Sequence, residues 1–259
     1  MKALQRFEKI IEAVRGKIEE EVSSLIGEQL ALTLNPGALV KKAEFFDQPL
    51  GKLVVARMDL SGEVNGKGAL ILLVKDAIRL GGTLIMLPPS ELEEVVSDER
   101  YEGETEDSYG EIANIIAGAY TKTFEEMYPK ACRFVRKEQQ VVVPLKVDSS
   151  SDDPIPDQIY YQIAMDMELD QRRMGTMFML VPAEAFNLVE DKAADDLTAP
   201  PAEPSAEQAG EPQSPLHEAS PVEEQPEASE KRIQPGTGSA AAGKPTGAAR
   251  QAAVLAVET

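Results

Sequence analysis

Only one histidine and one cysteine occur in this chain of 259 residues, and tryptophan is absent. The histidine, His217, lies in a segment rich in Pro, Ala and Glu that holds no aromatic residue. Catalysis by an ordered imidazole, as in a Ser/His/Asp triad or a His-ligated zinc site, is therefore excluded for the part that can fold. Cys132 has no second cysteine for a disulfide or a metal cluster, and we expect it to be a small, half-buried residue of a strand.

Glycine-rich phosphate-binding loops and long apolar runs are also missing. The first residues, MKALQRFEKIIEAV, carry charges throughout, unlike a signal peptide, and no later segment reaches membrane-spanning length. The sequence predicts a cytoplasmic protein whose chemistry rests on carboxylates, amides and hydroxyls, with no bound metal or cofactor.

The composition divides the chain in two. No aromatic residue follows Phe186, and Pro, Ala, Glu, Ser and Gly dominate from about Asp191 onward. Such a stretch cannot bury a core. We expect one folded domain over 1–190 and a disordered tail over 191–259, most simply a spacer.

Both parts are acidic. The tail has 5 basic and 12 acidic residues, net −7, which leaves 21 basic and 33 acidic residues and a net charge of −12 in 1–190. A surface this negative repels phosphate backbones and anionic membranes. We therefore expect neither nucleic acid nor membrane as a partner, and a basic protein surface fits better.

Apolar spacing indicates the elements of the domain. Steps of three and four predict a long helix over 3–34, with Gly16 as a candidate break and Asn35-Pro36-Gly37 as its end, and a second one over 106–127. Asn65-Gly66 favours a tight hairpin. Strands are expected over 51–64, 68–74, 133–143, 158–169 and 176–181, and short helices over 76–87, 90–96 (capped by Ser90) and 183–189.

The second half repeats the first. LILLVKDAIRL (70–80) resembles MFMLVPAEAFNL (177–188), and SSLIGEQLALTLNP (23–36) parallels NIIAGAYTKTFEEMYP (114–129). We infer an α+β fold with a duplicated unit about a pseudo-two-fold axis, in which long helices pack on a shared antiparallel sheet. Two independent domains are the weaker alternative, because neither half alone offers much core.

The second long helix has a polar stripe opposite its apolar face. Asp107, Glu111, Asn114 and Gly118 lie on it, followed by Thr121 and Glu125, while Tyr109, Ile112, Ile115, Ile116, Ala119, Thr123 and Met127 form the predicted core face. A stripe of acids alone would be read as a solvated face. Asn114 and Gly118 are poor choices for an exposed helix interior, with glycine costing about 1 kcal/mol against alanine, so we expect another molecule to approach there.

Asp107-x-x-x-Glu111-x-x-Asn114, followed by IIAGAY, resembles the phosphatase motif of the CheC, CheX and FliY chemotaxis family. GALILLVKDAIRLGGTLIMLP resembles that family's strand-and-helix segment, and the duplication is its architecture. The family's downstream proline has no match, because Pro129 comes early and Pro144 late.

The resemblance implies a phosphatase that acts on the aspartyl phosphate of a CheY-like receiver domain. Asn114 would orient the attacking water, Glu111 would bind the receiver's active-site lysine, and Asp107 and Gly118 would contact the receiver. The Mg²⁺ would be held by the receiver. CheX-like dimerisation through a sheet edge is implied as well.

Aligning the halves places Gly16, Glu20 and Ser23 opposite Asp107, Glu111 and Asn114. The first helix then lacks the amide, which favours a CheX-like protein with a single site. The alternative is an adaptor without enzymatic activity or a flagellar-switch component; FliY-like switch proteins carry a further C-terminal β-rich domain, where this chain has its tail.

Overall fold

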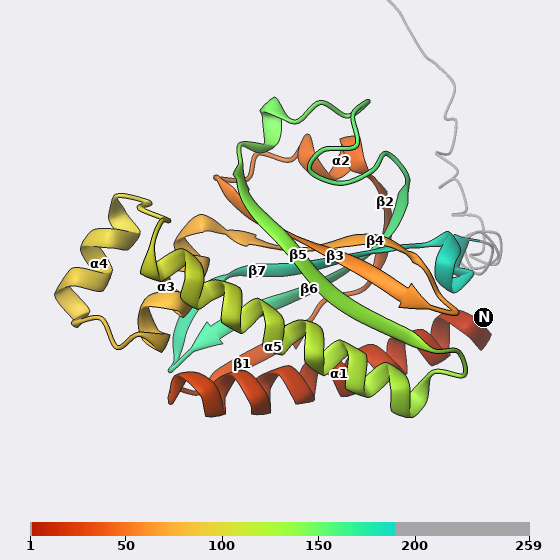
Figure 1. Cartoon of the computed structure of the whole chain (residues 1–259), viewed down its shortest axis with the longest axis horizontal. Helices are drawn as coiled ribbons and strands as arrows, with labels where there is room; N and C mark the ends of the chain where they lie inside the picture. Colours follow the sequence, from red (N-terminus) through yellow and green to blue (C-terminus); the bar gives the residue numbers. More distant parts are fainter. Residues whose placement is uncertain (1, 190–259) are drawn as a thin grey trace, which may run out of the picture. The chain divides into compact units, whose positions relative to one another are not determined.

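The computed structural model describes residues 2–189, and their centre is an antiparallel sheet of seven strands (Figure 1). The strands are β1 (Leu30–Leu34), β2 (Ala38–Lys41), β3 (Leu53–Gly62), β4 (Gly66–Leu73), β5 (Cys132–Val142), β6 (Ile159–Leu169) and β7 (Arg172–Pro182). Six of them follow the order β1-β6-β7-β4-β3-β5, and β2 pairs with β6 as a continuation of β1. β1–β2 and β5 are therefore the two edges.

Two long helices lie side by side over one face of this sheet (Figure 1). The helices are α1 (Lys2–Ile26), α2 (Lys42–Phe46), α3 (Val74–Leu84), α4 (Pro89–Ser97) and α5 (Glu104–Met127), with 3-10 turns at Pro144–Lys146 and Glu184–Phe186. Phe7 of α1 meets Phe124 of α5 with ring centres 5.8 Å apart. The main core lies between α1, α3, α5 and the sheet, which confirms the predicted α+β class.

The sheet order confirms the internal duplication. Each half runs long helix, edge strand and hairpin: α1, β1 and β3–β4 in the first, α5, β5 and β6–β7 in the second. From one edge of the sheet the order is β1, β6, β7, and from the other edge it is β5, β3, β4. Each edge strand is thus followed by the first and then the second strand of the other half's hairpin. The two halves thus form one sheet, related by a pseudo-two-fold axis, with one shared core.

The first helix is shorter than the sequence predicts. Gly27, with a φ of 75°, follows the last residue of α1, and Leu30–Leu34 is a strand paired with β6. Leu30 and Leu32 fit a helical spacing and also the two-residue alternation of a strand, and the ladder of hydrogen bonds to β6 decides between them. Asn35-Pro36-Gly37 separates β1 from β2 instead of ending a helix.

Smaller differences concern element ends. The helix is unbroken at Gly16, and α4 begins at Pro89 without a side-chain cap from Ser90. Of the predicted helix over 183–189, Glu184–Phe186 forms the 3-10 turn and residues 188–189 are α-helical. The hairpin at Asn65-Gly66 is present, but its loop has three residues, 63–65.

The opposite face of the sheet is covered by α2 and the segment after β5, neither predicted from sequence. Phe45, Phe46 and Ile155 pack there on the strands. Lys42 is fully buried, and its Nζ donates to the carbonyl oxygens of Asp148, Ser151 and Asp153 at 2.7–2.9 Å. This ammonium group fastens the loop 148–153 over the sheet, with three acceptors for its three protons.

Two further predictions concern the tail and membrane-spanning helices. The disordered tail over 191–259, with His217, lies outside the described residues. No helix in residues 2–189 is long and apolar enough to cross a membrane.

Asp76 ties α3 to β7. Its side chain is 7% exposed, and Oδ2 accepts a hydrogen bond from the backbone N–H of Gly175 at 3.0 Å. A methyl group at Gly175 would lie 2.5 Å from this oxygen, so glycine permits the approach. Burial raises the pKa of the Asp76 carboxyl above its ordinary value of 3.8, and the Gly175 bond and Arg79 oppose that shift.

We predict that Asp76→Asn stabilises the protein at pH 7. Because the folded-state pKa is raised, the folded state binds the proton more tightly, and stability falls as the pH rises from the ordinary pKa through the raised one. The amide removes that loss and can still accept from Gly175. Urea unfolding between pH 3.5 and 8 should show a flatter decline than in wild type. The exposed Asp157→Asn is the control, and a variant that is less stable at pH 7 with an unchanged slope would contradict the account.

Candidate functional site

The predicted stripe lies on the outer face of α5. Asp107, Glu111 and Asn114 are exposed, and Gly118 is half-buried. A methyl group at Gly118 would meet nothing within 4 Å, so packing does not require glycine there and the helix surface is open above it. From Asp107 to Gly118 the stripe is about 16 Å long, at 1.5 Å per residue.

The opposite face of α5 packs into the core largely as predicted. Tyr109, Ile112, Ile116, Ala119 and Thr123 are buried. Ile115 is half-buried, and Met127, which was expected in the core, is 38% exposed because it is the last residue of the helix.

Asn114 does not stand alone on this surface. Its Oδ1 accepts a hydrogen bond of 2.7 Å from Nε of Arg136, a half-buried residue of β5. Arg136 also donates from Nη1 to Oε1 of Gln139 at 3.3 Å, and Gln139 donates to the backbone oxygen of Glu106 at 2.9 Å. The amide of Asn114 is therefore oriented, with Oδ1 toward β5 and both Nδ2 protons free of this bond.

The sequence analysis did not predict Arg136 as a residue of this site. Cys132 and Phe134 are buried on the inner side of β5, and alternation puts residue 136 on that side too. An arginine at an inward position is the signal that could have revealed it. Gly110 of α5 lies beside it: a methyl group there would be 3.4 Å from Nη2 of Arg136, an ordinary van der Waals distance.

Two tyrosine hydroxyls lie near this arginine. The hydroxyl oxygens of Tyr101 and Tyr109 are buried and accept or donate no hydrogen bond within residues 3–189, and the rings meet edge to face at 6.1 Å. Burial raises the pKa of both hydroxyls, against the opposing charge of Arg136. Both stay protonated near neutral pH, so neither can act as a general base.

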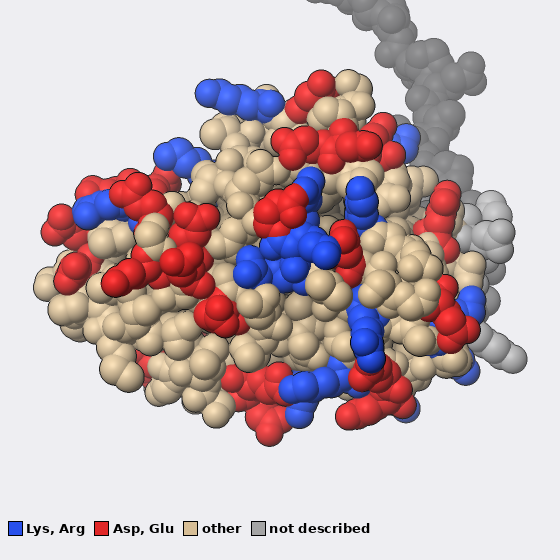
Figure 2. Space-filling view, viewed as in Figure 1, with Lys and Arg blue, Asp and Glu red and all other residues tan. Residues whose placement is uncertain are grey.

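Charges of both signs border the stripe. Glu104, Glu106 and Asp107 occupy the first turn of α5, and Figure 2 shows carboxylates gathered over α4 and the start of α5. Lys and Arg gather around β5, which carries Arg133, Arg136 and Lys137. A partner that docks on α5 would therefore meet an acidic end and a basic side.

The structure corrects the alignment of the two halves. Glu19 Oε1 accepts from the N–H of Leu32 on edge strand β1, and Thr121 Oγ1 accepts from the N–H of Phe134 on edge strand β5. These matching bonds pair residues that lie 102 positions apart in the sequence. The same offset pairs six buried positions of α1, namely Phe7, Ile10, Ile11, Val14, Ile18 and Val22, with buried Tyr109, Ile112, Ala113, Ile116, Tyr120 and Phe124.

Lys9 and Glu12 therefore stand opposite Glu111 and Asn114, instead of Glu20 and Ser23. Ser23 accepts a hydrogen bond from the N–H of Leu30 and so belongs to the helix-strand junction. Glu12, at the position that matches Asn114, is not an amide. One stripe per chain is therefore still expected, although the residues compared have changed.

Residues that could hold a metal do not cluster in the described part of the chain: no group of three His, Cys, Asp or Glu side chains is placed for it. Cys132 is buried at the start of β5, and burial raises the pKa of its thiol to about 12. It is a small residue of a strand, as expected, but it is fully buried in the core instead of half-buried.

No family model matches the sequence, and no curated protein matches it significantly. Solved structures do match. FliY from Thermotoga maritima aligns with a TM-score of 0.60 at 14% identity, covering 72% of this chain and 93% of that one. The FliM middle domain from Vibrio alginolyticus aligns with a TM-score of 0.56 at 10% identity, covering 72% and 98%.

The chain has the FliY and FliM middle-domain fold. The FliM middle domain from Helicobacter pylori matches similarly, with a TM-score of 0.56 at 10% identity over 74% of this chain and 98% of that one. The predicted family resemblance is confirmed for the fold. Solved CheX structures align with a TM-score of only 0.39, which does not help to choose between a CheX-like and a FliY-like protein.

We predict that Arg136→Ala destabilises the protein by about 1–2 kcal/mol, because it removes a half-buried charged donor from Asn114 and Gln139. Urea unfolding measures this. Arg133→Ala is the matched control on the same strand: Arg133 is exposed and pairs with Glu125 at 3.3 Å, so its loss should change stability by less than about 0.5 kcal/mol. Equal effects of the two changes would mean that the Arg136 bonds do not order the site.

Proposed function

We propose that the chain binds the phosphorylated receiver domain of a CheY-like response regulator through the exposed face of α5 and promotes hydrolysis of its aspartyl phosphate. The observation that carries this proposal is the placement of Glu111 and Asn114. They lie one helical turn apart, both exposed, on one of the two long helices of a FliY-like fold. The spacing matches the motif of the phosphatase family.

Asn114 would position the attacking water. Phosphoryl transfer leaves little covalent work for the protein, so a group that holds water in line with the phosphorus atom can supply much of the acceleration. The bond from Arg136 fixes the Asn114 amide before the partner arrives and directs Nδ2 away from β5. A fixed amide loses less conformational entropy on docking than a mobile one.

Glu111 would pair with the receiver's active-site lysine in a charge-assisted hydrogen bond and so set the register of the two proteins. Asp107, one turn earlier, would add to this contact. The open surface at Gly118 leaves space for the receiver backbone. The Mg²⁺ of the reaction would be bound by the receiver, and the residues of this chain would orient water and hold the partner.

The rival proposal is an adaptor that binds its partner without turnover. Three observations favour it. The fold is equally that of the FliM middle domain, and one solved FliM structure from Helicobacter pylori with a TM-score of 0.54 is a complex with FliG. In addition, Oδ1 of Asn114 is already engaged by Arg136. An adaptor would bind a receiver or switch protein and leave its phosphorylation unchanged.

We predict that Asn114→Ala lowers catalysed loss of phosphate at least about a hundredfold, as removal of one positioned polar group does in other enzymes. Glu111→Ala should raise the concentration needed for half-maximal rate about tenfold, because it loses one charge-assisted bond. The assay follows release of phosphate from a receiver domain phosphorylated with acetyl phosphate and Mg²⁺.

Lys9→Ala is the matched control, since Lys9 is exposed and holds the position on α1 that corresponds to Glu111, and its rate should equal that of wild type. Unchanged phosphate loss with and without wild-type protein, together with measurable binding to the receiver, would establish the adaptor instead. An active Asn114→Ala would remove the proposed site.

A further inference from the structure

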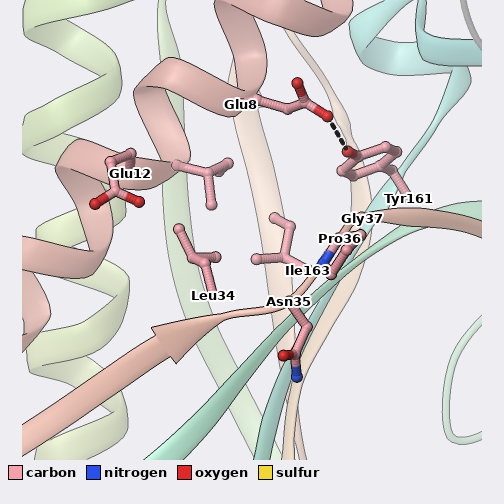
Figure 3. Close-up of a pocket in the computed structure, with 9 residues that line it drawn as sticks. Glu8, Glu12, Leu34, Asn35, Pro36, Gly37, Tyr161 and Ile163 are labelled. Atoms are coloured by element: carbon pink, nitrogen blue, oxygen red, sulfur yellow. Dashed lines mark hydrogen bonds between the residues drawn. The ribbon is translucent and has the colours of Figure 1, made fainter.

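An open groove lies in the first half of the molecule, at the place where Arg136 packs against α5 in the second half. It lies between α1 and the break between β1 and β2, with a volume of about 310 Å³. We call it the α1 groove. Figure 3 shows its apolar sides, formed by Leu34, Ile163 and Tyr161, with Glu8 and Glu12 extending from α1 at the rim. Ile11, also of α1, completes the apolar lining.

The two carboxylates of the groove differ in their partners. Glu8 accepts a hydrogen bond of 3.3 Å from the hydroxyl of Tyr161, the dashed line in Figure 3. Glu12 accepts from Nε and Nη2 of Arg15 at 3.0 and 2.6 Å. Within residues 3–189, no lysine or arginine forms an ion pair with Glu8. Glu8 is thus an exposed carboxylate beside an apolar surface, with acceptor capacity to spare.

The pseudo-two-fold axis shows what such a groove can hold. At the offset of 102 residues, Leu34 corresponds to Arg136. Arg136 lies along the second helix in the matching place, over Gly110 and with its Nε on Asn114. Both edge strands are irregular just beyond this point: β1 stops after Leu34, and β5 shifts its register on β3 between Arg136 and Gln139. The grooves are therefore equivalent in backbone.

The side chains at the two equivalent places differ in charge. In the second half, an arginine fills the groove, and the helix offers a glycine and a neutral amide, Gly110 and Asn114. In the first half, the arginine is replaced by Leu34, and the helix offers two acids, Glu8 and Glu12. Arg15 already pairs with Glu12, so Glu8 is the carboxylate of this groove that has no cationic partner within residues 3–189.

We propose that the α1 groove is a docking site for an arginine side chain presented by a partner protein. The aliphatic stem of arginine would cover Leu34, Ile11 and Ile163, and the planar guanidinium would reach Glu8. Lysine fits less well, because its compact ammonium group cannot form a forked pair with a carboxylate. The chain's net charge of −19 favours the approach of a basic segment. The site lies on α1, so it does not depend on the function proposed for α5.

The test uses the full chain and a defined probe. The blocked tripeptide Ala-Arg-Ala is titrated while backbone amide signals are followed by NMR, and the same peptide with citrulline, a neutral isostere of arginine, is the probe control. We expect saturable shifts at residues 8–12 of α1 and at Leu34 and Ile163, and binding about tenfold weaker for citrulline, which lacks the charge.

Variants of the groove sharpen the test. Glu8→Gln should weaken peptide binding about tenfold, whereas Glu20→Gln, an exposed acid of α1 outside the groove, should leave it unchanged. Leu34→Arg should place an arginine of the chain itself in the α1 groove, as Arg136 is placed in the second half, and so abolish peptide binding. Far-UV circular dichroism reports whether each variant is folded, and if Leu34→Arg fails to fold, the Glu8→Gln and citrulline results decide.

The proposal would be overturned by equal binding of the arginine and citrulline peptides, by shifts centred on the acidic start of α5, or by no saturation in the millimolar range. A concentration-dependent dimer that occupies the groove and disappears in Glu8→Gln would identify a second copy of the chain as the occupant, and would equally refute a separate partner.

Discussion

The structure depends on how the two edges of its sheet are covered. An open antiparallel sheet leaves a row of unpaired N–H and C=O groups at each edge, which favours association with other strands. Here each long helix lies beside one edge strand, and a side chain of the helix bonds the strand's backbone: Glu19 to Leu32 in the first half, Thr121 to Phe134 in the second. These bonds fix the position of α1 and α5 along the strands.

Everything of functional interest follows from that placement. Because α5 lies against β5, Arg136 of the strand reaches Asn114 of the helix and orders the stripe. Because α1 lies against β1 in the same way, its own groove appears in the equivalent place, but with Leu34 in place of the arginine and with Glu8 and Glu12 on the helix. The duplication thus provides one backbone arrangement twice, and the two halves differ in charge. One half carries an oriented amide, the other an acidic groove.

The sequence predicted those parts of the fold that local patterns determine. The spacing of Ile112, Ile116 and Ala119 defines α5 and, by exclusion, the exposed stripe. The hairpins are marked by alternation and by the Asn65-Gly66 turn. The end of α1 was wrong because Leu30 and Leu32 satisfy two periods at once, and only pairing with β6, more than 130 residues later, selects the strand.

Long-range contacts explain the remaining differences. The burial of Lys42 requires the carbonyl oxygens of a loop about 110 residues away, and nothing near Lys42 in the sequence marks it. Aligning the halves by sequence similarity matched Ser23 with Asn114. The edge-strand bonds match Asn114 with Glu12 instead, three helical turns earlier on α1. Arg136 could be noticed as an inward-facing charge, but its partner on α5 could not be named without the packing of the helix on the strand.

The most direct test of the central claim is the structure of the full chain bound to a receiver domain whose phosphorylation site carries beryllofluoride and Mg²⁺, which mimic the phosphorylated state. The account predicts that α5 contacts the receiver, with the Asn114 amide next to the beryllofluoride and Glu111 within hydrogen-bond distance of the active-site lysine. A complex in which the receiver lies on α1, on α4 or on the face covered by α2, with Asn114 left in solvent, would contradict it.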